Sequence, residues 1–287
     1  MKSIKRILLL ALVVILTTGC SLKKDTLVNS TIYTTIYPIE YLTEFLYSDY
    51  ATIESIYPKG ADINTYELTD KQLSNYAKGN LFIYNGLSEE KNITKNLINK
   101  NKNLLIIDVS NGLSYNNALE ELWMSPNNYL MLAKNIKDNL IEYLANSLII
   151  DSINNKYNEL AEILSLKDAD LRSIGKQAVS NGKNTLVVSS NALKFLESYG
   201  FNIISLDEDT LTESSYNAIK NNFSKKVYTS ILVLDNNYTE HINNIINEHQ
   251  ASAINISSMT NKSENQNDNY LDNIQSIIDS IRGITLN

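Results

Sequence analysis

The loop from Gly60 to Glu67, of sequence GADINTYE, carries side chains whose types and close spacing are suited to ligand chemistry. It holds the carboxylates of Asp62 and Glu67 and the amide of Asn64, all of which offer oxygen atoms. In a tight loop such groups commonly accept hydrogen bonds from backbone N–H groups. They are also the groups that bind polar ligands or hard cations. The position of the loop in the fold therefore decides between the two roles.

The sequence contains none of the usual catalytic constellations. It has no Gly-rich phosphate loop, no Cys near a His and no His near a candidate Ser. The segment Ser189-Ser190-Asn191 follows an apolar run like a nucleophile turn, but it lacks the flanking glycines. The only two histidines, His241 and His249, lie in or beside a helix with a surface pattern, and we interpret them as solvated. We therefore predict that the chain is not an enzyme.

A strand, a helix and a second strand are expected to position the Gly60–Glu67 loop. Residues 51–57 read as a strand that ends at the loop, a helix is capped near Thr69, and Leu81–Tyr84 reads as a buried strand. In open α/β sheets, ligands bind in the crevice at the carboxyl ends of the strands. The loop lies at such an end, which makes it the first candidate for a binding site.

Long helical segments separate this region from a second α/β region. Ser125-Pro126 is a helix start signal, and an apolar stripe from Ile153 to Ile174 predicts a helix of roughly 45 Å over about thirty residues. After Gly182 the strand–helix–strand order returns. The predicted fold class is α/β, with two lobes of parallel-type sheets joined by a long rigid helical spine. The expected N-terminal lobe, linking helix and C-terminal lobe are residues 30–148, 149–181 and 182–287.

The N-terminus has the features of an export signal. Lys2, Lys5 and Arg6 precede an uncharged apolar run, and Leu16-Thr-Thr-Gly-Cys20 resembles the lipobox at which bacterial lipoproteins are cut and acylated. We predict a signal peptide over residues 1–19, a lipidated Cys20 and a tether over residues 20–29. The protein would then lie on the outer face of the bacterial cell membrane. Since Cys20 is the only cysteine, internal disulfides are excluded.

The charge balance excludes some classes of partner. Cleavage before Cys20 removes Lys2, Lys5 and Arg6 and takes the formal charge from −7 to −10. Nucleic acids and anionic lipid surfaces attract proteins that carry a basic patch. We therefore expect neither nucleic-acid binding nor electrostatic attraction to anionic lipid.

Several motifs occur in a fixed order along the chain. They are Ile36-Tyr37-Pro38, the PKGADINTYE segment from Pro58 to Glu67, LFIYNGL from Leu81 to Leu87, LEELWMSP from Leu119 to Pro126, VSSNAL from Val188 to Leu193, and Tyr270-Leu271. Over residues 31–282 they resemble the metal-ion (zinc/manganese-type) solute-binding lipoproteins of ABC transporters. The resemblance implies a monomeric extracellular protein that captures its ligand between the lobes and delivers it to a membrane permease. It implies no resident cofactor, because zinc or manganese would be the transported ligand.

The resemblance also assigns cleft positions, on which this sequence differs from the family. At the positions of the family's first two histidines this chain has Asn64 and Glu121. The third ligand position corresponds to Ser190. The final Asp corresponds to Ser257, to within one residue. Only Glu121 keeps a charge. Neutral amide and hydroxyl groups are much weaker donors for zinc than imidazole or carboxylate.

Three hypotheses remain open for the cleft. It is repurposed for another small polar ligand or for a hard, oxygen-loving cation. Alternatively, it binds nothing, and the protein is a degenerate member that serves as an adhesin or accessory surface protein. In the third hypothesis it binds a metal through other ligands, for which the candidates are Glu121, Asp62, Glu67 and Asp207.

Overall fold

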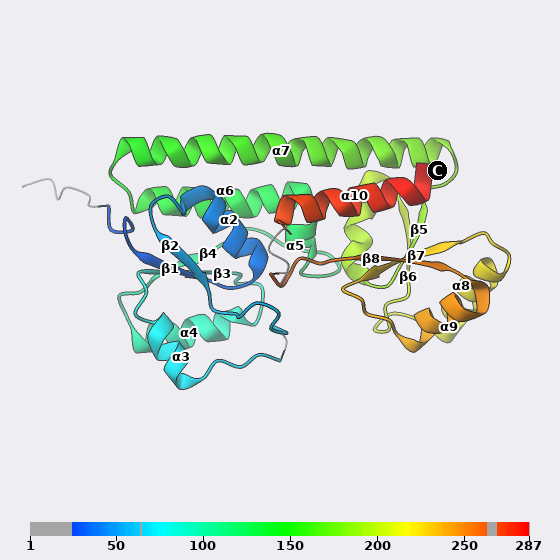
Figure 1. Cartoon of the computed structure of the whole chain (residues 1–287), viewed down its shortest axis with the longest axis horizontal. Helices are drawn as coiled ribbons and strands as arrows, with labels where there is room; N and C mark the ends of the chain where they lie inside the picture. Colours follow the sequence, from blue (N-terminus) through cyan, green and yellow to red (C-terminus); the bar gives the residue numbers. More distant parts are fainter. Residues whose placement is uncertain (1–24, 64, 263–268, 287) are drawn as a thin grey trace, which may run out of the picture.

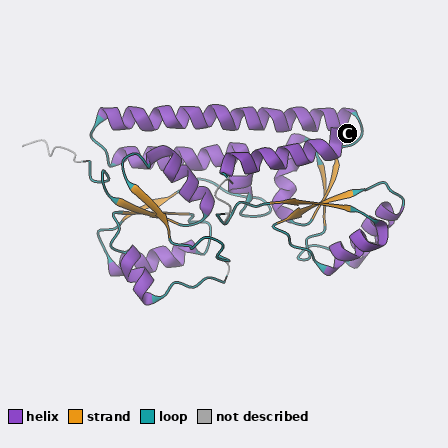
Figure 2. Ribbon diagram, viewed as in Figure 1, coloured by secondary structure: helices purple, strands orange, loops and turns teal. Residues whose placement is uncertain are grey.

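The chain forms two lobes, each built on a four-stranded parallel sheet (Figures 1 and 2). The computed structural model describes residues 25–63, 65–262 and 269–286. The signal peptide, Cys20 and Asn64 lie outside these residues. The first sheet contains β1 (Thr31–Thr34), β2 (Thr52–Ser55), β3 (Leu81–Tyr84) and β4 (Leu105–Asp108). The second contains β5 (Thr185–Val188), β6 (Asn202–Ser205), β7 (Ser230–Leu234) and β8 (Ser252–Ile256).

The two sheets have the same topology. Their strand orders are β2-β1-β3-β4 and β6-β5-β7-β8, and every neighbouring pair is parallel. In each sheet the connections change direction between the first and third strands, which is where ligands bind in open α/β sheets. The predicted fold class is confirmed.

Helices cover both faces of each sheet (Figure 1). The first lobe contributes α2 (Tyr37–Tyr47), α3 (Asp70–Tyr76), α4 (Glu90–Lys100), α5 (Glu121–Met124) and α6 (Pro126–Glu142). The spine and second lobe contribute α7 (Ser147–Ser180), η1 (Asn191–Tyr199), α8 (Glu213–Ser224), α9 (Glu240–His249) and α10 (Tyr270–Leu286). Figure 1 shows α7 extending along both lobes, with α6 and α10 between it and the sheets.

The spine helix α7 is stiff because its inner face is part of one continuous core. Its 34 residues correspond to a length of about 51 Å. Buried side chains on α7, such as Leu160 and Ile174, belong to the same cluster as Leu81 of the first sheet and Leu186 of the second. Close packing of this kind resists bending. No described helix is both long and apolar enough to cross a membrane.

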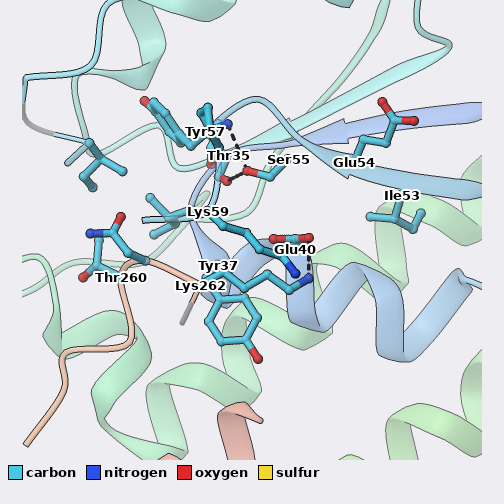
Figure 3. Close-up of a pocket in the computed structure, with 14 residues that line it drawn as sticks. Thr35, Tyr37, Glu40, Ile53, Glu54, Ser55, Tyr57, Lys59, Thr260 and Lys262 are labelled. Carbon is cyan, nitrogen blue, oxygen red and sulfur yellow. Dashed lines mark hydrogen bonds and ion pairs between the residues drawn. The ribbon is translucent and has the colours of Figure 1, made fainter. Parts of the chain in front are cut away.

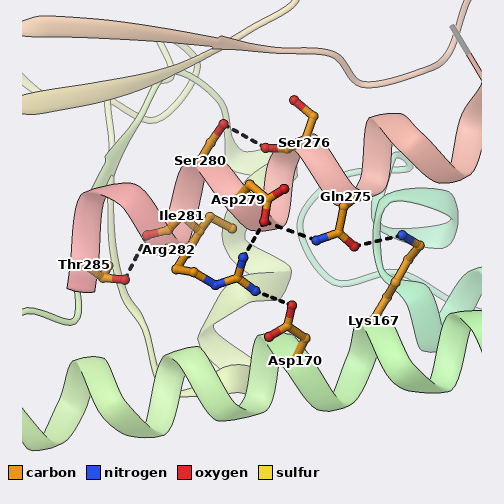
Figure 4. A network of polar contacts seen from close by, with 9 residues as sticks. All are labelled: Lys167, Asp170, Gln275, Ser276, Asp279, Ser280, Ile281, Arg282 and Thr285. Atoms are coloured by element: carbon orange, nitrogen blue, oxygen red, sulfur yellow. Dashed lines mark hydrogen bonds and ion pairs between the residues drawn. The ribbon is translucent and has the colours of Figure 1, made fainter. Parts of the chain in front are cut away.

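Polar contacts fix α10 along the spine (Figure 4). Arg282 pairs with Asp170 of α7 and with Asp279 of its own helix. Lys167 of α7 donates a hydrogen bond to the Gln275 side chain, with an Nζ–Oε1 distance of 3.0 Å. These groups are partly exposed, so they contribute little to stability and mainly set the alignment of the two helices.

One predicted helix has a different helix type. Residues 191–199 form a 3₁₀ helix, η1, which ends at Gly200 with a φ of 95°. The buried residues Leu193, Leu196 and Tyr199 recur every third position. Because a 3₁₀ helix has three residues per turn, this spacing places all three on one face.

Candidate functional site

The Gly60–Glu67 loop lies between two cavities. One, of about 320 Å³, is lined by Lys59 and Lys262 among others, and the second, of about 790 Å³, is lined by Glu67, Glu90 and Glu120 among others. Tyr57, Ile63 and Thr260 line both cavities. The loop therefore separates the two spaces.

Within the loop, Asp62 stabilises a turn. Its carbonyl accepts hydrogen bonds from the backbone N–H groups of Thr65 (3.2 Å) and Tyr66 (2.9 Å). Its carboxylate accepts one from the Thr65 hydroxyl at 3.1 Å. Glu67 is exposed at the wall of the larger cavity. Of the two predicted metal ligands in this loop, Asp62 therefore holds the turn, while Glu67 lies at the cavity wall.

Glu121 is buried and held by the turn that precedes it. Only 3% of the residue is exposed. Its carboxylate accepts hydrogen bonds from the backbone N–H groups of Asn116 and Asn117, both at 3.0 Å, and from the Asn117 amide at 2.8 Å. These three donors balance the buried charge, so a cation would have to compete with them.

Ser190 and Ser257 also have local roles. The Ser190 hydroxyl caps η1 by accepting a hydrogen bond from the backbone N–H of Ala192 at 3.2 Å. The exposed Ser257 accepts one from the N–H of Met259 at 3.0 Å. Ser257 lines a cavity of about 270 Å³ together with Asp235 and Asn273.

Glu120, on the first lobe, is within electrostatic reach of Asp207 and Asp235 on the second lobe. Burial raises the pKa of Glu120, and the negative charges of Asp235, Asp207 and Glu121 raise it further. Asp207 follows β6 and Asp235 follows β7, so both lie at the carboxyl edge of the second sheet. Acidic groups from both lobes therefore contribute to this region.

Backbone donors orient the two aspartates. Asp207 accepts from the N–H of Asn191 at 2.8 Å, and Asp235 accepts from the N–H of Ser258 at 2.7 Å. Among the described residues, no three His, Cys, Asp or Glu side chains are arranged as a metal-ligand set. Asp207 was a sequence candidate, whereas Glu120 and Asp235 were not. In the sequence, Asp235 could have been recognised as a candidate because it directly follows the apolar run that forms the buried strand β7.

Trp123 connects the two lobes. Its side chain is 2% exposed, and its indole N–H donates a hydrogen bond to the carbonyl of Ser258 at 2.9 Å. Ser258 is the residue whose N–H holds Asp235. Trp123 is packed in the core, at the wall of the larger cavity.

The segment that follows β8 continues across to the first lobe. The carbonyl of Thr260 accepts a hydrogen bond from the N–H of Tyr37, at the start of α2, at 3.1 Å. Lys262 then pairs with the buried Glu40 at 2.7 Å (Figure 3). It also pairs with Glu44 at 3.6 Å. Although burial opposes it, the contact with Glu40 raises the pKa of Lys262. Lys262 therefore occupies the smaller cavity as the partner of Glu40.

The histidines lie in the second lobe, and His241 pairs with Glu208, the residue that follows Asp207. His241 Nδ1 is 3.5 Å from Glu208, and the His241 ring contacts Tyr216 edge-on at 4.3 Å. His249 Nε2 is 3.9 Å from Glu248. Both histidines belong to α9.

A buried glutamate at the carboxyl edge of the first sheet makes stability depend on pH. Burial raises the pKa of Glu90 to about 7, with a smaller contribution from the charge of Asp108, although the Asn85 N–H opposes the shift. The folded state therefore keeps a proton that the unfolded chain releases near pH 4.5. The associated stability is fully present below pH 4.5 and is lost as pH rises through 7.

We expect the free energy of unfolding to fall by about 3 kcal/mol between pH 4.5 and 8 because of Glu90. Glu90→Gln should remove most of this slope and be more stable than the unaltered protein at pH 8. Urea unfolding over this pH range measures the effect. Glu89→Gln is the matched control, because the neighbouring Glu89 side chain is 84% exposed. Equal slopes for Glu90→Gln and the unaltered protein would contradict the assignment.

Comparisons with known proteins agree on one family and one fold. The sequence profile of the family ZnuA, described as zinc-uptake complex component A, periplasmic, matches residues 32–283. The iron-binding protein YfeA of Yersinia pestis is 27% identical over 187 residues, which cover 62% of this chain and 59% of YfeA. The chain thus spans about three fifths of the length of that curated relative.

Two solved structures share the fold at low sequence identity. The Zn(II)-bound ZnuA-like domain of Streptococcus pneumoniae AdcA gives a TM-score of 0.74 at 17% identity, covering 90% of this chain and 99% of the domain. The laminin binding protein Lmb of Streptococcus agalactiae has adhesin and metal transporting activity. It gives a TM-score of 0.72 at 16% identity, covering 89% of this chain and 99% of Lmb.

Proposed function

Because the chain belongs to the family of the periplasmic zinc-uptake component A, we propose that it captures a divalent cation between its lobes. The family consists of solute-binding proteins for metal uptake rather than enzymes. In this proposal the protein is a monomer that a lipidated Cys20 anchors to the outer face of the cell membrane. It passes the cation to an ABC permease in that membrane.

The interlobe carboxylates are the single observation that carries the choice of cargo. Glu120, Asp207 and Asp235 lie close enough for their charges to shift the pKa of Glu120. A bound divalent cation would relieve this repulsion, because it interacts favourably with all three groups. The proposed ligands are these three carboxylates, which are not arranged as a ligand set in the described part of the chain and would have to move together around the ion. Glu121 and Asp62 support the adjoining turns.

The chemistry of these groups favours manganese over zinc. Carboxylate and carbonyl oxygens suit Mn²⁺, Mg²⁺ and Ca²⁺, whereas tight zinc sites use imidazole or thiolate. The two histidines pair with Glu208 and Glu248 instead of with these carboxylates, and the only cysteine is Cys20. We therefore propose manganese as the transported ion, with zinc bound more weakly than in relatives that have histidine ligands.

Calorimetric titration of the metal-stripped mature chain, residues 21–287, tests the proposal. We expect one Mn²⁺ per chain and weaker binding of Zn²⁺. A folded protein that binds neither ion would overturn the proposal and favour the adhesin or accessory role. Zinc binding tighter than manganese binding would retain the uptake function but refute the carboxylate ligand set.

A further inference from the structure

The first described residues are docked at one end of the molecule. Asp25 Oδ1 accepts hydrogen bonds from the backbone N–H groups of Ala145 (2.7 Å) and Asn146 (2.9 Å), in the turn between α6 and α7. Leu27 is completely buried. The N–H of Asn29 donates to the carbonyl of Tyr50 at 2.7 Å. From Asp25 onward, the chain is therefore part of the folded body.

This docking shortens the connection to the proposed anchor. Five residue steps separate Cys20 from Asp25. A fully extended chain spans at most about 3.6 Å per residue, so the anchor lies within about 18 Å of Asp25. The spine helix is about 51 Å long. An anchor at Cys20 would thus keep the end with the α6–α7 turn close to the bilayer.

An exposed apolar side chain lies at the same end. Leu148, in the first turn of α7, is 76% exposed, the largest value among the exposed large hydrophobic residues that the structure describes. Its N–H donates to the Asn146 side chain at 3.0 Å, and the Asn146 backbone N–H donates to Asp25. Leu148 is therefore next to the point from which the anchor extends.

We propose that the end formed by Asp25 and residues 145–148, here called the anchored end, faces the phospholipid surface with Leu148 in contact with it. The proposal rests on the lipid anchor of the proposed function. In this orientation the spine points away from the membrane. The second lobe is then held at the far end of α7.

Charge favours this end-on orientation over one in which α7 lies flat. The exposed face of α7 between Leu148 and Leu166 carries Asp151, Glu159 and Glu162, of which only Asp151 lies close to Leu148. If the helix lay flat, these carboxylates would approach anionic headgroups and be repelled. The formal charge of −10 expected after cleavage before Cys20 supplies no general attraction either. Contact is therefore confined to the end that the acyl anchor holds and to Leu148.

The spine supplies a matched pair of labelling sites. Leu166 is 65% exposed and lies 18 residues after Leu148 on the same helix. Eighteen residues make five full turns, so both side chains point to the same side, separated by about 27 Å along the axis. Leu148→Cys and Leu166→Cys each place one thiol there, because acylated Cys20 is not available for labelling. Both positions are exposed, so neither change disturbs the core.

The experiment uses the full lipoprotein in vesicles of phosphatidylethanolamine and phosphatidylglycerol with an acceptor dye on the headgroups. A donor dye at position 148 should show several-fold more energy transfer to the membrane than the same dye at position 166. A polarity-sensitive dye at position 148 should also shift to the blue when vesicles are added.

The outcomes separate this inference from the anchor itself. If the unaltered lipoprotein does not float with vesicles, or if Cys20→Ser floats equally well, the anchor is refuted and the inference fails with it. If the protein floats and the two sites transfer equally, the anchor stands but the end-on orientation is refuted. Greater transfer from position 166 would likewise overturn the orientation.

Discussion

Tyr270→Ala is expected to lower the free energy of unfolding by about 3–5 kcal/mol, the range for removing a buried aromatic side chain. Tyr270, in α10, is fully buried, and its ring stacks on Tyr129 of α6 with centroids 4.2 Å apart. Its hydroxyl donates a hydrogen bond to the carbonyl of Trp123. One side chain thus joins α10, α6 and the turn that carries Glu120. Urea unfolding followed by circular dichroism measures the loss.

Two variants separate packing from hydrogen bonding at this position. Tyr270→Phe keeps the ring and leaves the Trp123 carbonyl without this donor, so we expect a loss of about 1–2 kcal/mol. Tyr115→Ala removes a tyrosine that is 42% exposed, and its effect should stay within about 0.5 kcal/mol. If Tyr270→Ala cost no more than Tyr115→Ala, this contact between the helices would not support the fold.

Glu120→Gln and Asp235→Asn are each expected to weaken Mn²⁺ binding at least tenfold, which corresponds to about 1.4 kcal/mol. Each change removes one negative charge from the proposed ligand set and leaves the side-chain shape nearly unchanged. The two carboxylates come from different lobes, so similar losses would indicate that the cation bridges the lobes. Calorimetric titration at fixed pH gives the affinities.

The control for this pair is Asp209→Asn. Asp209 is an exposed carboxylate two residues from Asp207, and it is not among the charges that shift the pKa of Glu120. We expect Asp209→Asn to bind Mn²⁺ as the unaltered protein does. An equal loss in all three variants would point to a general effect of net charge instead of direct ligation.

Much of the fold is a consequence of local sequence signals. The predicted strand Leu81–Tyr84 forms over those residues, because short apolar runs bounded by polar residues are typical of buried parallel strands. The helix predicted to be capped near Thr69 begins at Asp70, with a reciprocal pair of hydrogen bonds between Thr69 and Gln72. Such features depend on neighbours within a few residues, so the sequence alone indicates them.

The long-range arrangement of the segment after β8 could not be predicted in the same way. Position in the family suggested Ser257 as a cleft residue there. In the structure the following residues matter more. Ser258 contacts Trp123 and Asp235, and Lys262 reaches Glu40, which is 222 positions away in the chain. Contacts over such separations depend on how the two lobes meet.

Residue patterns alone indicate two parallel α/β lobes, a helical spine and cleft positions that lack the family's histidines. The difference between the neighbouring carboxylates of Glu120 and Glu121 becomes visible only in the folded chain. Glu120 and Glu121 are adjacent, yet Glu121 turns back to Asn116 and Asn117 while Glu120 lies near Asp207 and Asp235. Successive residues of a helical turn point about 100° apart, so the rotation of the turn selects between them. The buried bond from Trp123 to Ser258 fixes that rotation, and it exists only once both lobes have folded together.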